Sequence, residues 1–185
     1  MNAIEALTQR NSIAALTGPD ITPEQIDIMI QAALRAADHG WLKPSRFIAV
    51  RGEQRNKLGQ VFLETKEGWQ EMSEDQQYKL LNSPTRAPLM IISVCSSKEH
   101  PKIPLVEQLH STAASTQNII NAAWALGLGA IWRTGSPAHN EKVAQALGLT
   151  ENEHIVGFIY VGHRNQEPKP LPKLNTEDFV TELNL

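Results

Sequence analysis

The stretch LVEQLHSTAASTQNIINAAWAL, residues 105–126, decides the fold because it reads as one long helix that carries almost no charge. Glu107 is its only ionised residue, and small or apolar side chains fill nearly its whole circumference. A helix of this composition is buried on most of its sides. In a chain of 185 residues, this predicts a helix at the centre of the domain or one packed against a second subunit.

A strongly apolar strand is predicted just before this helix, at LMIISVCS, residues 89–96. Its composition is typical of a strand that is covered on both faces. Cys95, the only cysteine of the chain, lies inside it. A single cysteine excludes an internal disulfide, and its setting favours a small buried residue over a nucleophile.

Helix and strand patterns alternate through the rest of the chain, and capping boxes at Thr22–Gln25 and Ser73–Gln76 mark two helix starts. Further helices are predicted at 2–9, 22–38, 53–68, 73–81 and 140–148, and further strands at 46–52, within 127–135 and at 155–163. The long helical connections exclude simple hairpins. This order predicts an α+β or α/β fold of three layers, in a single domain of residues 1–185, with a proline-rich tail that runs extended over the surface or over a partner.

The bulk composition gives no reason to expect a nucleic acid or a membrane as partner. The chain is 41% hydrophobic and 20% charged, with a formal net charge of −3, which is ordinary for a globular protein. Its apolar runs are too short to span a bilayer, and the first residues lack the apolar core of a signal peptide. We therefore expect a cytoplasmic protein.

Several familiar catalytic motifs are absent from the sequence. There is no HExxH, CxxC, GxSxG or GK[ST] motif, and no histidine has partners at metal-ligand spacing, so no metal site is predicted. The glycines at 127 and 129 follow a helix and precede a strand, which is the reverse of a dinucleotide-binding fingerprint. Gly127 is better explained as the C-terminal cap of the long helix.

Three small clusters combine a cation with hydrogen-bond donors, and each also has a purely structural explanation. Residues 10–12, RNS, can hold a phosphate, but they are also good turn formers. Arg35 and His39 are four residues apart and would share one face of a continuing helix, where basic groups also complement the helix dipole. Arg133 and Thr134 close an apolar strand, which suits either a ligand site or a turn.

Taken together, these clusters resemble the nitroreductase family of FMN flavoproteins, and its compact branch most closely. The resemblance covers nearly the whole chain. No single motif is highly specific, but their joint order is. Beside RNS, the motifs that carry it are TPEQIDIMIQAALRAADH (22–39), RAPLMIISV (86–94), STQNIINAAWALGLGAIWRTG (115–135) and IVGFIYVGH (155–163).

The resemblance implies an α+β, three-layer α-β-α sandwich that forms an intertwined homodimer with two tightly bound FMN molecules at the subunit boundary. By position, Arg10, Asn11 and Ser12 would hold the FMN phosphate and ribityl chain from one subunit, and Arg35 and His39 would reach the same flavin from the other. Trp132, Arg133 and Thr134 would line the isoalloxazine. A nicotinamide contact would fall on the helix end, residues Ala122, Ala123, Trp124, Ala125, Leu126 and Gly127, although core packing explains that segment equally well.

The chain departs from the common family pattern after Arg35. Trp41 and Lys43 stand where an asparagine and a glutamine are usual, which leaves the acceptor and the reduction potential open. Lys43 could add positive charge near the flavin, and Trp41 could cover a ring face or plug the dimer. The family's C-terminal phosphate-binding arginine has no secure counterpart, and Lys173 is only a candidate.

The residue types suit flavin chemistry, because an FMN phosphate needs arginine and amide donors, and hydride transfer needs no protein nucleophile. The resemblance implies an NAD(P)H oxidoreductase with ping-pong kinetics, acting on a nitroaromatic, quinone or similar electron-poor acceptor. A cation or amide dipole near flavin N1 would favour the reduced form, and Arg133 is a candidate for that role. Two alternatives stay open: a flavin-binding protein with different redox chemistry, and a dimeric scaffold without a cofactor.

Overall fold

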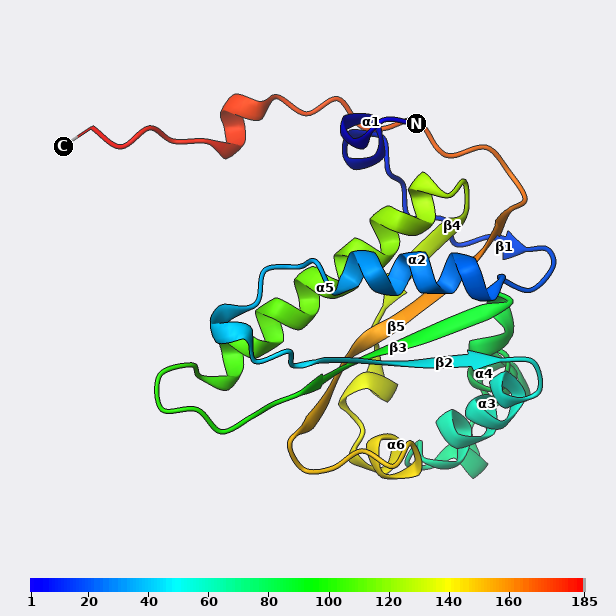
Figure 1. Ribbon diagram of the computed structural model, residues 1–185. Helices are drawn as coiled ribbons and strands as arrows, with labels where there is room; N and C mark the ends of the chain where they lie inside the picture. Colours follow the sequence, from blue (N-terminus) through cyan, green and yellow to red (C-terminus); the bar gives the residue numbers. More distant parts are fainter. Residues whose placement is uncertain (185) are drawn as a thin grey trace.

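The computed structural model describes residues 1–184 and is built around a twisted antiparallel sheet (Figure 1). Its strands are β1 (Leu16–Thr17), β2 (Ser45–Arg51), β3 (Leu89–Ser96), β4 (Gly129–Arg133) and β5 (Glu153–Arg164). β3 lies between β2 and β5. Both β4 and β1 pair with the other edge of β5, β4 with residues 158–162 and β1 with residues 163–164. β1 was not expected from the sequence, since two residues are too few to produce a strand pattern.

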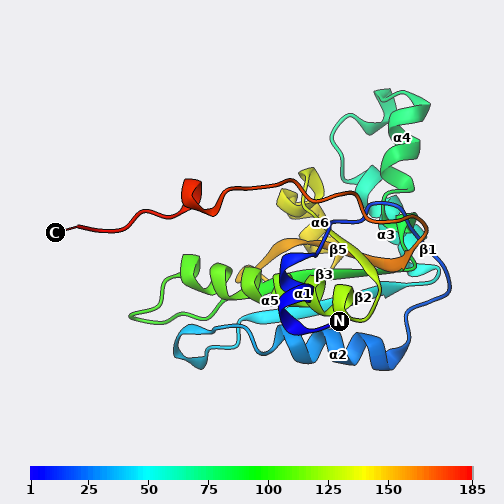
Figure 2. The same cartoon turned by 90° about the horizontal axis from the view of Figure 1, so that it is seen from above.

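Helices cover both faces of this sheet and produce three layers (Figure 2). The α-helices are α1 (Ala3–Thr8), α2 (Pro23–Ala33), α3 (Gln54–Glu64), α4 (Glu74–Leu81), α5 (Leu105–Ala125) and α6 (Glu141–Ala146). Short 3₁₀ turns occur at η1 (His39–Trp41), η2 (Trp69–Glu71), η3 (Pro84–Arg86), η4 (Ser136–His139) and η5 (Thr176–Phe179). Helices α2 and α5 pack on one face, and α3, α4 and α6 lie on the other. The predicted α+β sandwich is confirmed.

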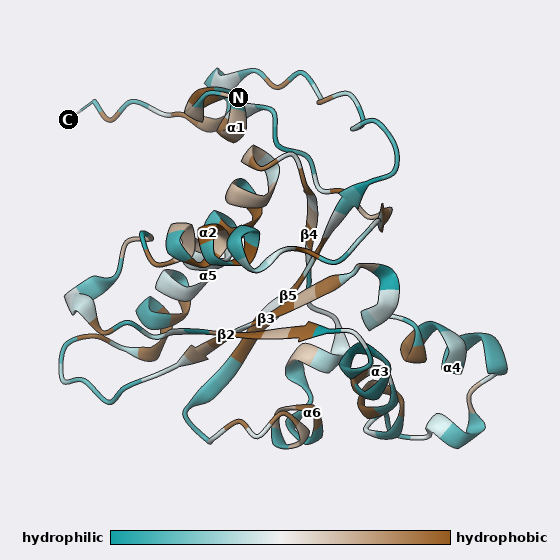
Figure 3. Cartoon of the chain, turned by 45° about the vertical axis from the view of Figure 1, so that its right-hand side comes forward, coloured by the Kyte–Doolittle hydropathy of each residue, from teal (hydrophilic) through white to brown (hydrophobic). Residues whose placement is uncertain are grey.

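Strand β3 supplies both halves of the core, because its alternating residues point to opposite faces. Leu89 and Ile91 join the cluster under α2 and α5, whereas Met90 and Ile92 join the cluster under α3 and α6. Figure 3 shows the apolar colouring of the central strands against the polar loops and tail. Cys95 is fully buried, and burial raises the pKa of its thiol. Both features agree with the prediction of a strand covered on both sides and an inert cysteine.

Helix α5 extends as far as its composition predicts and ends at the glycine expected to cap it. Gly127 has φ +79°, and the amide of Leu128 donates to the carbonyl of Ala123 at 2.9 Å. This is the Schellman arrangement, in which a left-handed residue lets the chain turn back and satisfy a free carbonyl. The turn leads directly into β4, so the cap determines where this strand begins.

Helix α2 is shorter than the sequence predicts, and the predicted common face of Arg35 and His39 is wrong. The helix ends at Ala33, after which Arg35 donates its amide to the carbonyl of Ala32 in a tighter turn. Asp38 is extended, and His39 opens the separate turn η1. The basic pair therefore does not stack on one helix, because the chain leaves helical geometry between its two members.

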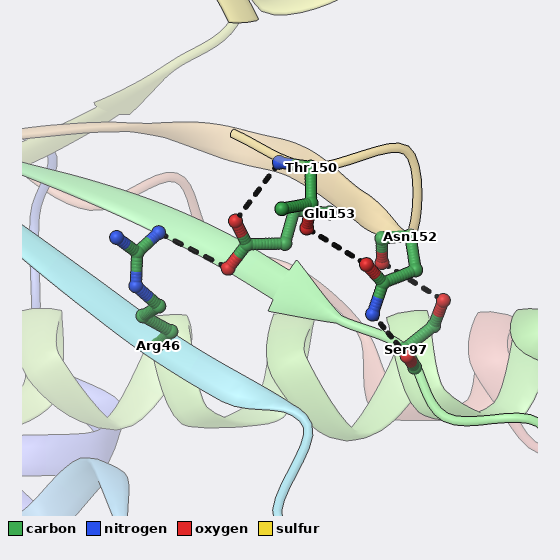
Figure 4. A network of polar contacts seen from close by, with 5 residues as sticks. All are labelled: Arg46, Ser97, Thr150, Asn152 and Glu153. Carbon is green, nitrogen blue, oxygen red and sulfur yellow. Dashed lines mark hydrogen bonds and ion pairs between the residues drawn. The ribbon is translucent and has the colours of Figure 1, made fainter. Parts of the chain in front are cut away.

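A compact polar network anchors the start of β5 (Figure 4). Glu153 accepts from the Nη1 of Arg46 in β2 at 3.1 Å and from the amide of Thr150 at 3.2 Å. Asn152 donates from Nδ2 to the carbonyl of Ser97 at 2.7 Å, and its own carbonyl accepts from the Ser97 hydroxyl at 2.9 Å. These bonds fix the turn before β5 against β2 and the end of β3, and thereby set the register of the longest strand.

The C-terminal segment after β5 is extended, as its prolines predict, and runs past α1 before the short turn η5 (Figures 1 and 2). Its apolar side chains are largely exposed, with Phe179 72% and Leu183 80% accessible. In the part of the chain that the structure describes, no helix is long and apolar enough to cross a membrane.

Candidate cofactor site

The structure places the RNS cluster at the outer edge of β4, beside the first residues of that strand, whose other end carries the cluster of Trp132, Arg133 and Thr134. The amide of Ile13 donates to the carbonyl of Ala130 at 3.0 Å, which ties the segment after RNS to the start of that strand. Gly129 allows this approach, because a Cβ there would lie 2.7 Å from Leu16 Cδ2. The two clusters therefore share one strand but lie toward its opposite ends.

The donors at this edge form a group suited to an anion. The Arg10 guanidinium donates from Nη1 to the Ser12 hydroxyl at 3.4 Å, and Asn11 Nδ2 donates to the carbonyl of Lys169 at 2.8 Å. Within residues 1–184, no carboxylate pairs with Arg10. A guanidinium and a hydroxyl that no carboxylate neutralises are groups that hold a phosphate.

The side chains at the end of β4 point to opposite faces of the sheet. Trp132 packs against the cluster under α2 and α5 and donates from Nε1 to the carbonyl of Val156 at 3.3 Å. The guanidinium carbon of Arg133 lies 6.0 Å from the ring centroid of Tyr160, on the side of α3 and α6. One flat ligand therefore cannot contact both side chains on one face. It can contact the backbone of the strand end and the exposed Thr134.

Tyr160 is a buried neighbour of Arg133 that the sequence gives no means to identify. Burial raises the pKa of its phenol, while the cations Arg86 and Arg133 and a hydrogen bond to Ser83 oppose that shift. The whole residue is only 5% exposed. The Tyr160 ring thus lies next to the Arg133 guanidinium. Arg86 adds a second positive charge near the same tyrosine.

The third predicted cluster is divided along α5. His39 contacts the carboxylate of Glu107 through Nδ1, near the start of α5, whereas Ile13 packs against Trp124 near its end; the turn η1, which His39 opens, lies beside the start of α5 in Figure 1. Arg35 follows Ala32, whose carbonyl accepts from Asn118 Nδ2 at 3.0 Å in the second half of α5. A single chain therefore does not bring His39 to the Arg10 group. The contact with Glu107 leaves Nε2 as the ring nitrogen of His39 that is free for a ligand.

Beside Tyr160, the residues Glu107 and Lys169 are neighbours of the site that sequence analysis missed. The sequence contains a hint of Glu107, because it is the single ionised residue of an otherwise uncharged helix. It contains none of Lys169, since the position of that residue beside Asn11 depends on the path of the extended tail. Within residues 1–184, Lys173, the lysine considered from the sequence, forms no hydrogen bond or ion pair with the Arg10 group, whereas the backbone carbonyl of Lys169 accepts from Asn11.

The segment predicted to contact a nicotinamide is divided between core and surface. Ala123 is fully buried and Trp124 is 5% exposed, with the guanidinium carbon of Arg164 3.8 Å from the Trp124 ring. Ala125 and Gly127 are exposed. Packing accounts for the buried pair, so only the exposed positions are available to a ligand.

A cavity of about 770 Å³ lies between η4, α6 and the start of β5, away from the predicted residues. Its lining includes His139, Leu149 and His154, but none of the predicted cofactor residues. The Arg10 group and the end of β4 instead form an open edge. An open edge encloses a ligand only when another part of the protein covers it. In a site shared between subunits, the second subunit would provide that cover.

Sequence comparisons identify one family. The Nitroreductase family matches residues 7–163 of the chain. The chain is 35% identical over 186 residues to the protein of Escherichia coli (strain K12) named "Putative NAD(P)H nitroreductase YdjA", with 98% of this chain and 99% of that protein covered. It is 26% identical over 196 residues to the NADPH-flavin oxidoreductase of Vibrio harveyi, with 100% of this chain and 77% of the relative covered.

Solved structures agree on the fold. The nitroreductase-like family protein from Bacillus cereus superposes with a TM-score of 0.84 at 21% identity, covering 99% of this chain and 96% of that one. The NADPH:FMN oxidoreductase from Vibrio harveyi complexed with NAD+ superposes with a TM-score of 0.75 at 24% identity, covering 98% of this chain and 77% of that one.

Proposed function

Because the chain belongs to the nitroreductase family, we propose that it is an FMN-dependent NAD(P)H oxidoreductase. The observation that carries the proposal is the donor group at the edge of β4, where the Arg10 guanidinium meets the Ser12 hydroxyl and, within residues 1–184, pairs with no carboxylate. These residues fit FMN, because its phosphate carries a charge near −2 and needs such donors.

The chain's own residues bind and orient, and the cofactor supplies the redox chemistry. FMN would supply the two-electron chemistry that moves a hydride from a nicotinamide to an electron-poor acceptor such as a nitroaromatic or quinone, in ping-pong order. Arg10 and Ser12 would hold its phosphate, and the end of β4 would support its ring system. Arg133, which lies 6.0 Å from the Tyr160 ring, would provide positive charge that favours the reduced flavin.

The functional unit in this proposal is a homodimer with two shared sites. His39 lies too far from the Arg10 group to serve the same flavin within one chain, so it reaches the flavin of the partner, and the family resemblance assigns Arg35 to that same site. The open edge of β4 and the exposed apolar side chains of the tail support the same arrangement, since both need a cover.

A second candidate is a flavin-binding protein that nicotinamides do not reduce. Two observations favour it: the unusual Trp41 and Lys43 beside His39, and the burial of Ala123 and Trp124 in the segment predicted to contact the nicotinamide. Both candidates require FMN, and they differ only in the reaction with NAD(P)H.

The purified protein is expected to be yellow and to show flavin absorption bands that bleach under anaerobic NADH or NADPH. Stopped-flow absorbance measures both the bleaching and its recovery with a nitroaromatic or quinone. Colourless protein that takes up no added FMN would overturn the proposal. Flavin that binds but stays oxidised with both nicotinamides would favour the second candidate.

Lys169→Ala is expected to weaken FMN binding several-fold, because it removes a positive charge from the residue whose backbone carbonyl holds Asn11. Lys173→Ala is the matched control, because it removes the same charge from the same tail without a backbone tie to Asn11. Fluorescence titration of the apoprotein with FMN measures both dissociation constants. Equal losses in the two variants would show that general tail charge, and not Lys169, assists the phosphate site.

A further inference from the structure

The loop of residues 38–43, here called the Trp41 loop, holds an unusual backbone conformation. Gly40 has φ +68°, and Trp41 and Lys43 are non-glycine residues with φ +58° and +50°. Left-handed geometry at a bulky residue costs on the order of 1 kcal/mol or more. Such a conformation persists only when the surroundings impose it.

The surroundings of the Trp41 loop do impose it. The Lys43 amide donates to Asp38 Oδ2 at 2.7 Å, and Lys98 Nζ donates to the carbonyl of Leu42 at 2.5 Å. At Gly40, an added Cβ would lie 2.5 Å from Ile103 Cδ1, so the backbone is pressed against that side chain. The loop is therefore fixed from both sides of Trp41, independently of the Trp41 side chain.

The side chains of the two strained residues, Trp41 and Lys43, are not buried in the core of the described chain. Trp41 is 82% exposed, the largest exposed fraction among the large hydrophobic residues of the described chain. Lys43 is exposed, and among residues 1–184 its ammonium group has no ion-pair partner. The loop thus fixes the backbone of Trp41 and Lys43 next to His39, which the proposed function assigns to the flavin site.

We propose that Trp41 and Lys43 form the recognition surface for an aromatic electron acceptor that carries negatively charged or strongly polar oxygen substituents, such as a nitrobenzoate. This inference rests on the proposed function. The electron-poor ring stacks on the electron-rich indole face, and the ammonium attracts the nitro or carboxylate oxygens. A rigid loop makes both contacts at little entropic cost, which explains why the chain maintains the strained conformation.

The test measures acceptor binding and flavin reoxidation separately in FMN-loaded protein. Calorimetric titration of the oxidised protein with 4-nitrobenzoate, without a nicotinamide, gives the dissociation constant. Stopped-flow reoxidation of the reduced protein gives rate constants for 4-nitrobenzoate, nitrobenzene and dioxygen, the last of which cannot stack. The variants are Trp41→Ala, Trp41→Phe and Lys43→Ala, and Tyr78→Ala on α4 is the control for loss of an exposed aromatic side chain.

Trp41→Ala is expected to raise the 4-nitrobenzoate dissociation constant about tenfold and to lower the nitrobenzene-to-dioxygen rate ratio by a similar factor. Trp41→Phe retains most of the binding, because a phenyl ring still stacks. Lys43→Ala lowers the preference for 4-nitrobenzoate over nitrobenzene several-fold. Tyr78→Ala leaves all three quantities at wild-type values.

Three outcomes would overturn the inference. An unchanged rate ratio in Trp41→Ala would remove the stacking role, and equal losses for all acceptors would indicate a general structural effect. Loss of FMN or of the dimer in Trp41→Ala would assign the indole to the cofactor or the subunit contact. Wild-type protein that binds no FMN would contradict the proposed function itself, which distinguishes that failure from the others.

Discussion

Arg10→Ala protein is expected to emerge from purification nearly colourless, with FMN bound about 100-fold more weakly than in the wild type. The guanidinium makes two charge-assisted hydrogen bonds when it holds a phosphate, each contributing roughly 1.5 kcal/mol. Its neighbours in the described chain do not replace it, since Ser12 carries no charge and Asn11 donates to the carbonyl of Lys169. Fluorescence titration with FMN measures the loss. Arg10→Lys should recover part of it, because a lysine keeps the charge but not the fork geometry.

A second variant turns this loss into a test of the shared site. Arg35→Ala is also expected to bind FMN poorly, and the proposed homodimer places Arg35 in the site that the partner's Arg10 completes. Mixing Arg10→Ala and Arg35→Ala under conditions of subunit exchange should restore one intact site in each heterodimer. Absorbance after removal of free FMN would show the recovery. No recovery, once exchange has been proven with labelled chains, would place the two arginines in the same chain's site.

The sequence predicts the layers of this fold well because composition controls burial. The uncharged segment 105–126 becomes α5, the apolar segment 89–96 becomes β3, and the two capping boxes open α2 and α4 as expected. The end of α2 is mispredicted, because Arg35 and Ala36 are good helix formers and the chain still turns after Ala33. Tertiary contacts of the following loop, which no local pattern contains, decide that boundary.

The candidate site is predicted less completely, because its neighbours come from distant parts of the chain. RNS and the end of β4 are readable from their residue types, but the position of RNS beside β4 depends on the pairing of Ile13 with Ala130. The partner of His39 is Glu107, 68 residues away. The opposite directions of Trp132 and Arg133 follow from strand alternation, which the sequence also contains. Strand alternation therefore already implies that Trp132 and Arg133 cannot both line one face of the flavin.

Gly157 packs directly against the Trp132 side chain of β4, and its replacement is predicted to have a large effect on stability. A Cβ at this position would lie 2.0 Å from Trp132 Nε1 and 3.0 Å from the carbonyl oxygen of Arg133. Gly157 pairs with Ser93 at the point where the β3–β5 register shifts, so the strand cannot move away without disturbing the central pair. The indole must therefore leave its hydrogen bond with Val156.

Gly157→Ala is accordingly expected to lower the free energy of unfolding by about 3 kcal/mol, the upper range for overpacking a core position. Urea unfolding followed by circular dichroism measures the change. A double-mutant cycle supplies the control: in a Trp132→Ala background, the same glycine substitution should cost less than about 1 kcal/mol, because the clashing ring is gone. An equal cost in both backgrounds would mean that the Arg133 carbonyl, and not the indole, limits the space. In either case the end of β4 moves, so Gly157→Ala should also bind FMN more weakly than the wild type, which connects the packing of β5 to the proposed function.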